Sequence, residues 1–125
     1  MGKRKVMVID DEENFLKIIK LNLEGTGQYE VLALSNAENI LDELHRFKPD
    51  IIFLDLLMPS IGGIEICEEL NRDALGSKTP IIIVSGLDKE QDKLKAYKLG
   101  VIDYLNKPID LKTMLNVIDK ALCEF

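Results

Sequence analysis

The sequence predicts one α/β domain, in which a five-stranded, doubly wound parallel sheet is covered by helices on both faces. Short apolar segments rich in β-branched residues alternate five times with longer segments of helical periodicity. Turn residues separate them, and no repeat or linker interrupts the alternation. With 125 residues, of which 46% are hydrophobic, the chain suits one domain, residues 1–125, that buries a core without disulfides.

The five predicted strands are short and increasingly apolar toward the middle of the chain. They are expected at residues 5–9, 29–34, 51–54, 81–84 and 103–105. The third and fourth are uninterrupted apolar runs, which is typical of strands buried on both faces at the centre of a parallel sheet. Pro80 precedes the fourth, and Pro59 ends pairing soon after the third.

The predicted helices carry apolar residues at three- and four-residue steps. They are expected at residues 12–24, from a cap at Ser35 or Asn36 to Pro49, through 64–70, from a cap at Asp88 to 99, and through 111–122. Right-handed crossovers return the chain to the same end of each parallel strand, so the carboxyl ends of all strands, and the loops after them, lie on one edge of the sheet.

Charge and composition exclude several classes of protein. Sixteen basic against 22 acidic residues give a net charge of -6, which argues against direct nucleic-acid binding. No apolar run approaches the length of a membrane span, so we expect a cytoplasmic protein without a membrane partner. Cys67 and Cys123 are far apart and fall on apolar helix positions, as expected of core residues in a reducing compartment.

Polar residues gather at the predicted sheet edge. Asp10 and Asp11 follow the first strand, Asp55 the third, Ser85 the fourth and Lys107 the fifth. An aspartate after a strand can simply start a turn, but crowded carboxylates repel one another and call for a counter-charge. Oxygen ligands suit Mg²⁺, and an ammonium with a hydroxyl suits phosphoryl oxygens. The set therefore predicts phosphoryl transfer to a carboxylate.

The same residues carry a resemblance that runs nearly from end to end. The motifs are the Asp10-Asp11 pair, residues 54–59 with Gly63 eight residues after Asp55, residues 81–86 with Ser85-Gly86, and residues 100–108 with Tyr104 and Lys107-Pro108. In this order and spacing they resemble the response-regulator receiver domains of two-component signalling. The resemblance implies a flavodoxin-like (βα)5 fold with strand order 2-1-3-4-5 and a cis bond before Pro108.

The resemblance also implies a role for each site residue. Asp55 would be the phosphoacceptor, and Asp11, Asp55 and the backbone carbonyl of Leu57 would bind Mg²⁺, with Asp10 acting through water. The phosphoryl oxygens would be held by Ser85 and Lys107, and Tyr104 would be the switch aromatic that turns inward when Ser85 moves.

The expected function is a phosphorylation-activated signalling switch that is not a turnover enzyme. A sensor histidine kinase, a phosphotransfer protein or a small acyl phosphate would be the donor, and an effector or output domain would receive the signal. Phosphorylation could also drive homodimerisation. The expected read-out surface comprises the helix over residues 88–99, the last strand and the last helix. Apolar Leu57 and Leu87 cannot orient an attacking water, which predicts slow self-dephosphorylation.

Three other functions remain alternatives. A Mg²⁺-dependent phosphohydrolase with an aspartyl-phosphate intermediate would use similar groups, but in that class a nucleophile in a DxD motif follows the first strand. A flavodoxin-like nucleotide binder would need a phosphate loop where Asp10 and Asp11 stand. A receiver-like binding module without phosphorylation would not need the complete site. His45 is expected on a solvent-facing helix surface, not as a phosphocarrier.

Overall fold

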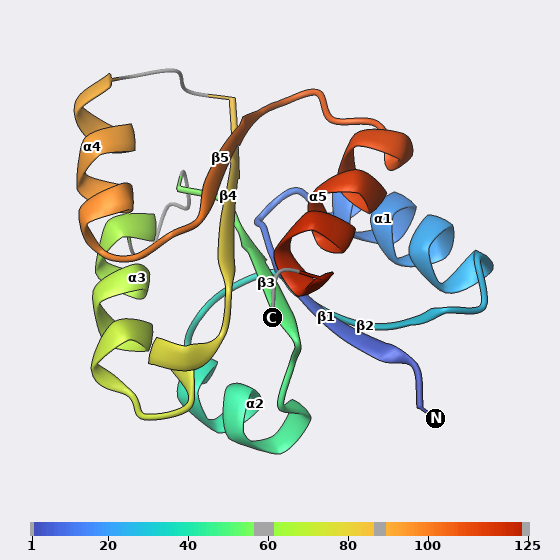
Figure 1. Cartoon of the computed structure of the whole chain (residues 1–125), viewed down its shortest axis with the longest axis horizontal. Helices are drawn as coiled ribbons and strands as arrows, with labels where there is room; N and C mark the ends of the chain where they lie inside the picture. Colours follow the sequence, from blue (N-terminus) through green and yellow to red (C-terminus); the bar gives the residue numbers. More distant parts are fainter. Residues whose placement is uncertain (1, 57–61, 87–89, 124–125) are drawn as a thin grey trace.

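A five-stranded parallel sheet forms the centre of the computed structural model, which describes residues 2–56, 62–86 and 90–123 (Figure 1). Its strand order is β2-β1-β3-β4-β5, and every neighbouring pair is parallel, as predicted. The strands are β1 (Arg4–Ile9), β2 (Tyr29–Leu34), β3 (Ile51–Leu54), β4 (Ile81–Ser85) and β5 (Asp103–Asn106).

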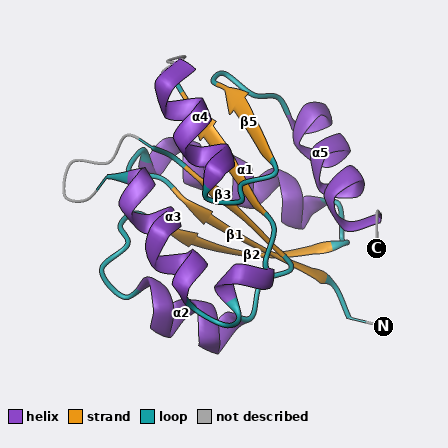
Figure 2. Cartoon of the chain, turned by 60° about the vertical axis from the view of Figure 1, so that its left-hand side comes forward, coloured by secondary structure: helices purple, strands orange, loops and turns teal. Residues whose placement is uncertain are grey.

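Helices cover both faces of this sheet. They are α1 (Glu13–Gly25), α2 (Ile40–Phe47), α3 (Gly63–Arg72), α4 (Glu90–Lys98) and α5 (Leu111–Cys123), with a 3-10 turn, η1, at Gly76–Lys78. Figures 1 and 2 show α1 and α5 together on one face and α2, α3 and α4 on the other. Among the helices of the described ranges, none is both long and apolar enough to cross a lipid bilayer.

The hydrophobic core consists of two clusters, one on each face of the sheet. Side chains alternate along a strand, so Ile52 and Leu54 of β3 pack toward α2, α3 and α4, whereas Ile51 and Phe53 pack toward α1 and α5. All four are buried, which explains the unbroken apolar run in the sequence. Cys67 is fully buried in the first cluster, as predicted.

The predicted start of the second helix is wrong. The helix begins at Ile40, and neither Ser35 nor Asn36 caps it. Instead, the side-chain oxygen of Asn36 accepts the backbone N–H of Glu38 at 3.1 Å, which forms a local turn ahead of the helix. The predicted cap of the fourth helix, Asp88, lies outside the described residues.

Strand register fixes which residues meet at the carboxyl edge of the sheet. Ile9 pairs with Leu54, and the backbone N–H of Asp55 donates to the carbonyl of Ile9 at 3.0 Å, so the ends of β1 and β3 are level. On the other side Ser85 pairs with Asn106, and the Lys107 N–H donates to the Ser85 carbonyl at 2.9 Å. The Lys107–Pro108 bond is cis, as predicted.

Candidate functional site

Two buried aspartates and one exposed aspartate meet at the carboxyl ends of β1 and β3. Asp10 and Asp55 are buried and Asp11 is exposed, and each offers a carboxylate oxygen that lies within 4.8 Å of those of the other two. Parallel strands in level register deliver all three groups to one edge, as the sequence predicts. The structure therefore brings together the three carboxylates proposed from the sequence.

Lys107 supplies positive charge to this cluster from the end of β5. Its ammonium lies 2.6 Å from Asp10 Oδ2, 2.8 Å from Glu12 Oε1 and 3.6 Å from Asp55 Oδ2. It also lies 4.5 Å from the centre of the Phe15 ring, a cation–π contact. The ammonium is thus held among three carboxylates and an aromatic face, with the side chain only 14% exposed.

The surroundings of Lys107 stabilise its charged form. Burial by itself lowers the pKa of Lys107, but hydrogen bonds to Asp10 and Glu12, together with the negative charges of Asp10 and Asp55, raise it overall. Both oxygens of the buried Asp10 carboxylate have a partner. One contacts the Lys107 ammonium, and the other accepts the backbone N–H of Glu12 at 2.9 Å. Charge compensation between these groups allows two carboxylates to be buried at this edge.

Glu12 is a member of the site that the sequence analysis missed, because it was assigned only to the start of a helix. It occupies the N-cap position of α1, yet its side chain makes no capping hydrogen bond. Instead its carboxylate reaches Lys107, 95 residues away in the chain. A third acidic residue directly after an aspartate pair in a strand-to-helix loop was the available signal.

Ser85 and Tyr104 lie on the neighbouring strands β4 and β5. Ser85 is fully buried at the last position of β4, and Tyr104 is buried on β5, opposite Ile83 in the β4–β5 register. The ammonium of Lys93, on α4, lies 5.4 Å from the centre of the Tyr104 ring. Tyr104 thus already occupies a buried position next to α4 in this structure.

Two apolar residues of the sequence-based site lie outside the described residues. They are Leu57, whose carbonyl was expected to bind the metal, and Leu87, which follows Ser85 by two positions. Gly63, the first residue of α3, packs closely against the backbone of Leu56. A Cβ on Gly63 would lie 2.4 Å from the Cα of Leu56, so only glycine fits without a shift of the backbone.

The residues present fit a hard divalent cation. The cluster offers only oxygen ligands, and two of its three carboxylates are buried, with Lys107 paired to both of them within the described residues. Oxygen ligands with a net negative charge are what Mg²⁺ and Ca²⁺ require, and a divalent ion would relieve the repulsion between the carboxylates.

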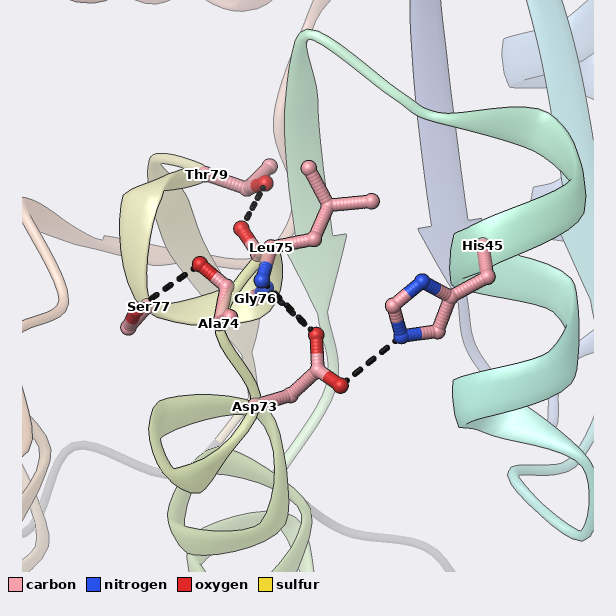
Figure 3. Close-up of polar contacts among 7 residues, drawn as sticks. All are labelled: His45, Asp73, Ala74, Leu75, Gly76, Ser77 and Thr79. Atoms are coloured by element: carbon pink, nitrogen blue, oxygen red, sulfur yellow. Dashed lines mark hydrogen bonds and ion pairs between the residues drawn. The ribbon is translucent and has the colours of Figure 1, made fainter.

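The single histidine, His45, lies in the last turn of α2 (Figure 3). That helix leads into the amino end of β3, whereas the carboxylates follow the carboxyl ends of the strands. Its side chain is 53% exposed, but Nε2 lies 2.8 Å from Asp73 Oδ1, so His45 is not merely a solvent-facing residue. The other oxygen of Asp73 accepts the backbone N–H groups of Leu75 and Gly76, both at 2.9 Å. This contact ties α2 to the turn before β4 and is separate from the carboxylate cluster.

Comparison with known proteins identifies the family. The family model described as response regulator receiver domain matches residues 6–119. The alkaline phosphatase synthesis transcriptional regulatory protein PhoP of Bacillus subtilis (strain 168) is 38% identical over 105 residues, which are 84% of this chain and 42% of that protein. The chain thus matches less than half of the length of this curated relative.

Solved structures agree with this assignment. The chemotaxis protein CheY4 of Vibrio cholerae has the same fold, with a TM-score of 0.90 at 23% identity over 97% of this chain and 100% of that one. A response regulator of Burkholderia pseudomallei, solved with a phosphorylated aspartic acid, a calcium ion and citrate, matches with a TM-score of 0.84 at 25% identity, covering 98% of this chain and 70% of that one. This chain therefore belongs to the receiver domains of two-component response regulators, which are signalling switches operated by phosphorylation.

Proposed function

We propose that Asp55 is the phosphoacceptor of this receiver domain. The observation that supports it best is the position of its carboxylate, buried at the end of the central strand between Asp10, Asp11 and the Lys107 ammonium. An Asp55 oxygen attacks the phosphorus of a phosphohistidine or an acyl phosphate, and a P–O bond forms. The P–N bond, or the P–O bond to the acyl group, breaks, and its electron pair leaves with the donor.

Receiver domains bind a divalent cation at their acidic site, and we propose Mg²⁺ for this one. Asp11 and Asp55 would hold it directly, with the Leu57 carbonyl, and Asp10 would hold it through water. When bound, the ion offsets the negative charge of the carboxylates and of the transferring oxygens.

Lys107 and Ser85 bind the transferred group in this proposal. The Lys107 ammonium, 3.6 Å from Asp55 Oδ2, is close enough to contact a phosphoryl oxygen on that carboxylate. The buried Ser85 hydroxyl stands at the end of the neighbouring strand and would donate to another. Each hydrogen bond to a charged group is worth roughly 1.5–3 kcal/mol, and moving a two-state equilibrium from 1:99 to 99:1 needs about 5.5 kcal/mol. Two such bonds supply most of that difference.

The read-out surface would be formed by α4, β5 and α5. Tyr104 is the residue through which the site would act on it, because it lies on β5 and contacts Lys93 of α4. Three large apolar side chains are exposed nearby, Leu94 and Tyr97 on α4 and Ile102 just before β5. Exposed apolar groups of this kind suit a partner protein or a second copy of the chain.

The partners follow from the family. Response regulators receive phosphoryl groups from histidine kinases and pass the signal to output domains, and the longer curated relative PhoP is named as a transcriptional regulatory protein. We place this chain in the cytoplasm. A sensor histidine kinase or a phosphotransfer protein is the proposed donor, and an output domain or effector is the proposed receiver. Self-dephosphorylation would be slow, because Leu57 and Leu87 offer no polar group to orient a water.

Intact mass after incubation with acetyl phosphate and Mg²⁺ tests the proposal. The wild-type chain should gain one phosphoryl group, and neither the chain in EDTA nor Asp55→Asn should gain any. An adduct that persists in Asp55→Asn would identify another acceptor. No adduct on the wild type would favour the binding module without phosphorylation, and multiple turnover on small phosphomonoesters would favour the phosphohydrolase.

A further inference from the structure

Lys107 contacts the phosphoacceptor less closely than it contacts two other carboxylates. Its ammonium hydrogen-bonds to Asp10 Oδ2 at 2.6 Å and to Glu12 Oε1 at 2.8 Å, whereas Asp55 Oδ2 lies at 3.6 Å. An ammonium has three protons, and two of them are engaged by residues that do not accept the phosphoryl group. The two shorter contacts hold the ammonium toward Asp10 and Glu12, so a phosphoryl group on Asp55 competes with them when it draws the ammonium toward itself.

The two closer contacts differ in how easily they can be given up. The Asp10 side chain is 2% exposed, so separating it from Lys107 would leave a buried carboxylate without its cation. The Glu12 side chain is 64% exposed, and its carboxylate is hydrated as soon as the contact breaks. Glu12 is thus the partner that Lys107 can exchange at low cost.

The structure allows Lys107 to leave Glu12 by a movement of side chains alone. The Lys107 backbone is fixed by the hydrogen bond from its N–H to the Ser85 carbonyl, and the Phe15 ring supports the ammonium from one side. The Glu12 side chain has no capping role in α1 that would oppose its release. Release of Glu12 therefore breaks no capping hydrogen bond of α1, and the hydrogen bond that holds the Lys107 backbone does not involve the lysine side chain.

We propose that Glu12 is a positioning residue, which binds Lys107 in the unphosphorylated state and competes with the phosphoryl group on Asp55 for its ammonium. This inference rests on the proposed function, because it assumes that Asp55 is phosphorylated and that Lys107 binds the phosphoryl group. Glu12 lowers the affinity of the site for the phosphoryl group, and phosphorylation releases the Glu12 carboxylate to solvent.

Beryllofluoride, which mimics a phosphoryl group on a carboxylate, provides a direct test. Its dissociation constant would be measured at saturating Mg²⁺ for the wild type, Glu12→Gln and Glu13→Gln, after the Mg²⁺ affinity of each has been determined. An exposed ion pair is worth a factor of about two to five, so Glu12→Gln should bind beryllofluoride about two- to fivefold more tightly than the wild type. Glu13→Gln removes the same charge one residue later, from an exposed side chain bordering a groove with Lys17 and Lys20, and should leave the constant unchanged.

A second measurement separates release of Glu12 from a general change of charge. In the wild type, the side-chain carboxyl ¹³C resonance of Glu12 should move when beryllofluoride is added at saturating Mg²⁺, and that of Glu13 should stay in place. Equal tightening in Glu12→Gln and Glu13→Gln, no tightening in Glu12→Gln, or a stationary Glu12 resonance would overturn the inference while leaving the proposed function intact. A wild type that binds no beryllofluoride at all would overturn both.

Discussion

Replacing Lys107 by methionine should destabilise the metal-free protein, because the change removes the cation from a buried carboxylate. Asp10 is almost fully buried and lies 2.6 Å from the ammonium, and Asp55, also buried, lies 3.6 Å away. Methionine fills a similar volume but carries no charge, so the main loss is electrostatic. The third contact, to Glu12, is exposed and contributes little.

The expected loss is about 3 kcal/mol at neutral pH. Breaking a fully buried ion pair by removing one partner costs roughly 3–5 kcal/mol. The lower end applies here, because Lys107 is 14% exposed and solvent already screens part of the interaction. The free energy of unfolding would be measured by urea denaturation in the presence of EDTA, which removes bound divalent cations.

A double-mutant cycle with Asp10→Asn identifies the source of the loss. In the Asp10→Asn background only the longer contact to buried Asp55 remains, so Lys107→Met should cost clearly less there than in the wild type. Independent sites add within roughly 0.5 kcal/mol. If Lys107→Met costs the same in both backgrounds within that margin, Lys107 does not compensate Asp10 and the electrostatic account of the site is wrong.

Two further predictions concern residues away from the carboxylates. Gly63→Ala should lower the free energy of unfolding by about 1–3 kcal/mol, because its Cβ would lie 2.4 Å from the backbone of Leu56; Gly25→Ala, with open space around it, is the control and should cost nothing in the same denaturation experiment. Asp73 accepts hydrogen bonds from Gly76 and His45, which lower its pKa in the folded state. A carboxyl group whose pKa is lower in the folded than in the unfolded state stabilises the fold at pH values above the unfolded pKa, which is about 4. This stabilisation is lost as the pH falls through the pKa of the folded state. Melting temperatures would be measured from pH 6 downward, in steps of about half a pH unit, until the protein no longer folds. They should fall less steeply for Asp73→Asn than for the wild type, and parallel curves would show that Asp73 does not contribute in this way.

The sequence by itself determined the secondary structure of the central sheet. The unbroken apolar runs at β3 and β4 are typical of strands covered on both faces, and β3 lies where predicted, at Ile51–Leu54. Alternation of strands and helices implied a parallel sheet and placed the carboxyl ends of its strands on one edge. The strand order came from the family resemblance, because periodicity does not determine which strands are neighbours.

Local sequence did not determine the start of α2. Asn36 is a good capping residue, but its side chain forms a turn with the Glu38 backbone, and the helix begins at Ile40. An asparagine side chain can either cap a helix or close a short turn with the backbone two residues later, and the local sequence does not decide between these two hydrogen-bonding patterns. Tertiary packing contributes to the choice, because Ala37 of this turn and Ile40 at the start of α2 are both buried in the same core cluster.

Contacts between distant residues were decided only by the tertiary structure. The sequence placed Asp10, Asp55 and Lys107 on one edge, and a third acidic residue after Asp10 and Asp11, but it did not determine that Glu12 shares the lysine with Asp10. That contact depends on the level ends of β1 and β3 and on the β4–β5 register, which bring side chains 95 residues apart within 2.8 Å. Periodicity predicts which face of an element is buried. Which charged groups meet at its end depends on register and on side-chain direction, and these are fixed only when the whole sheet has formed.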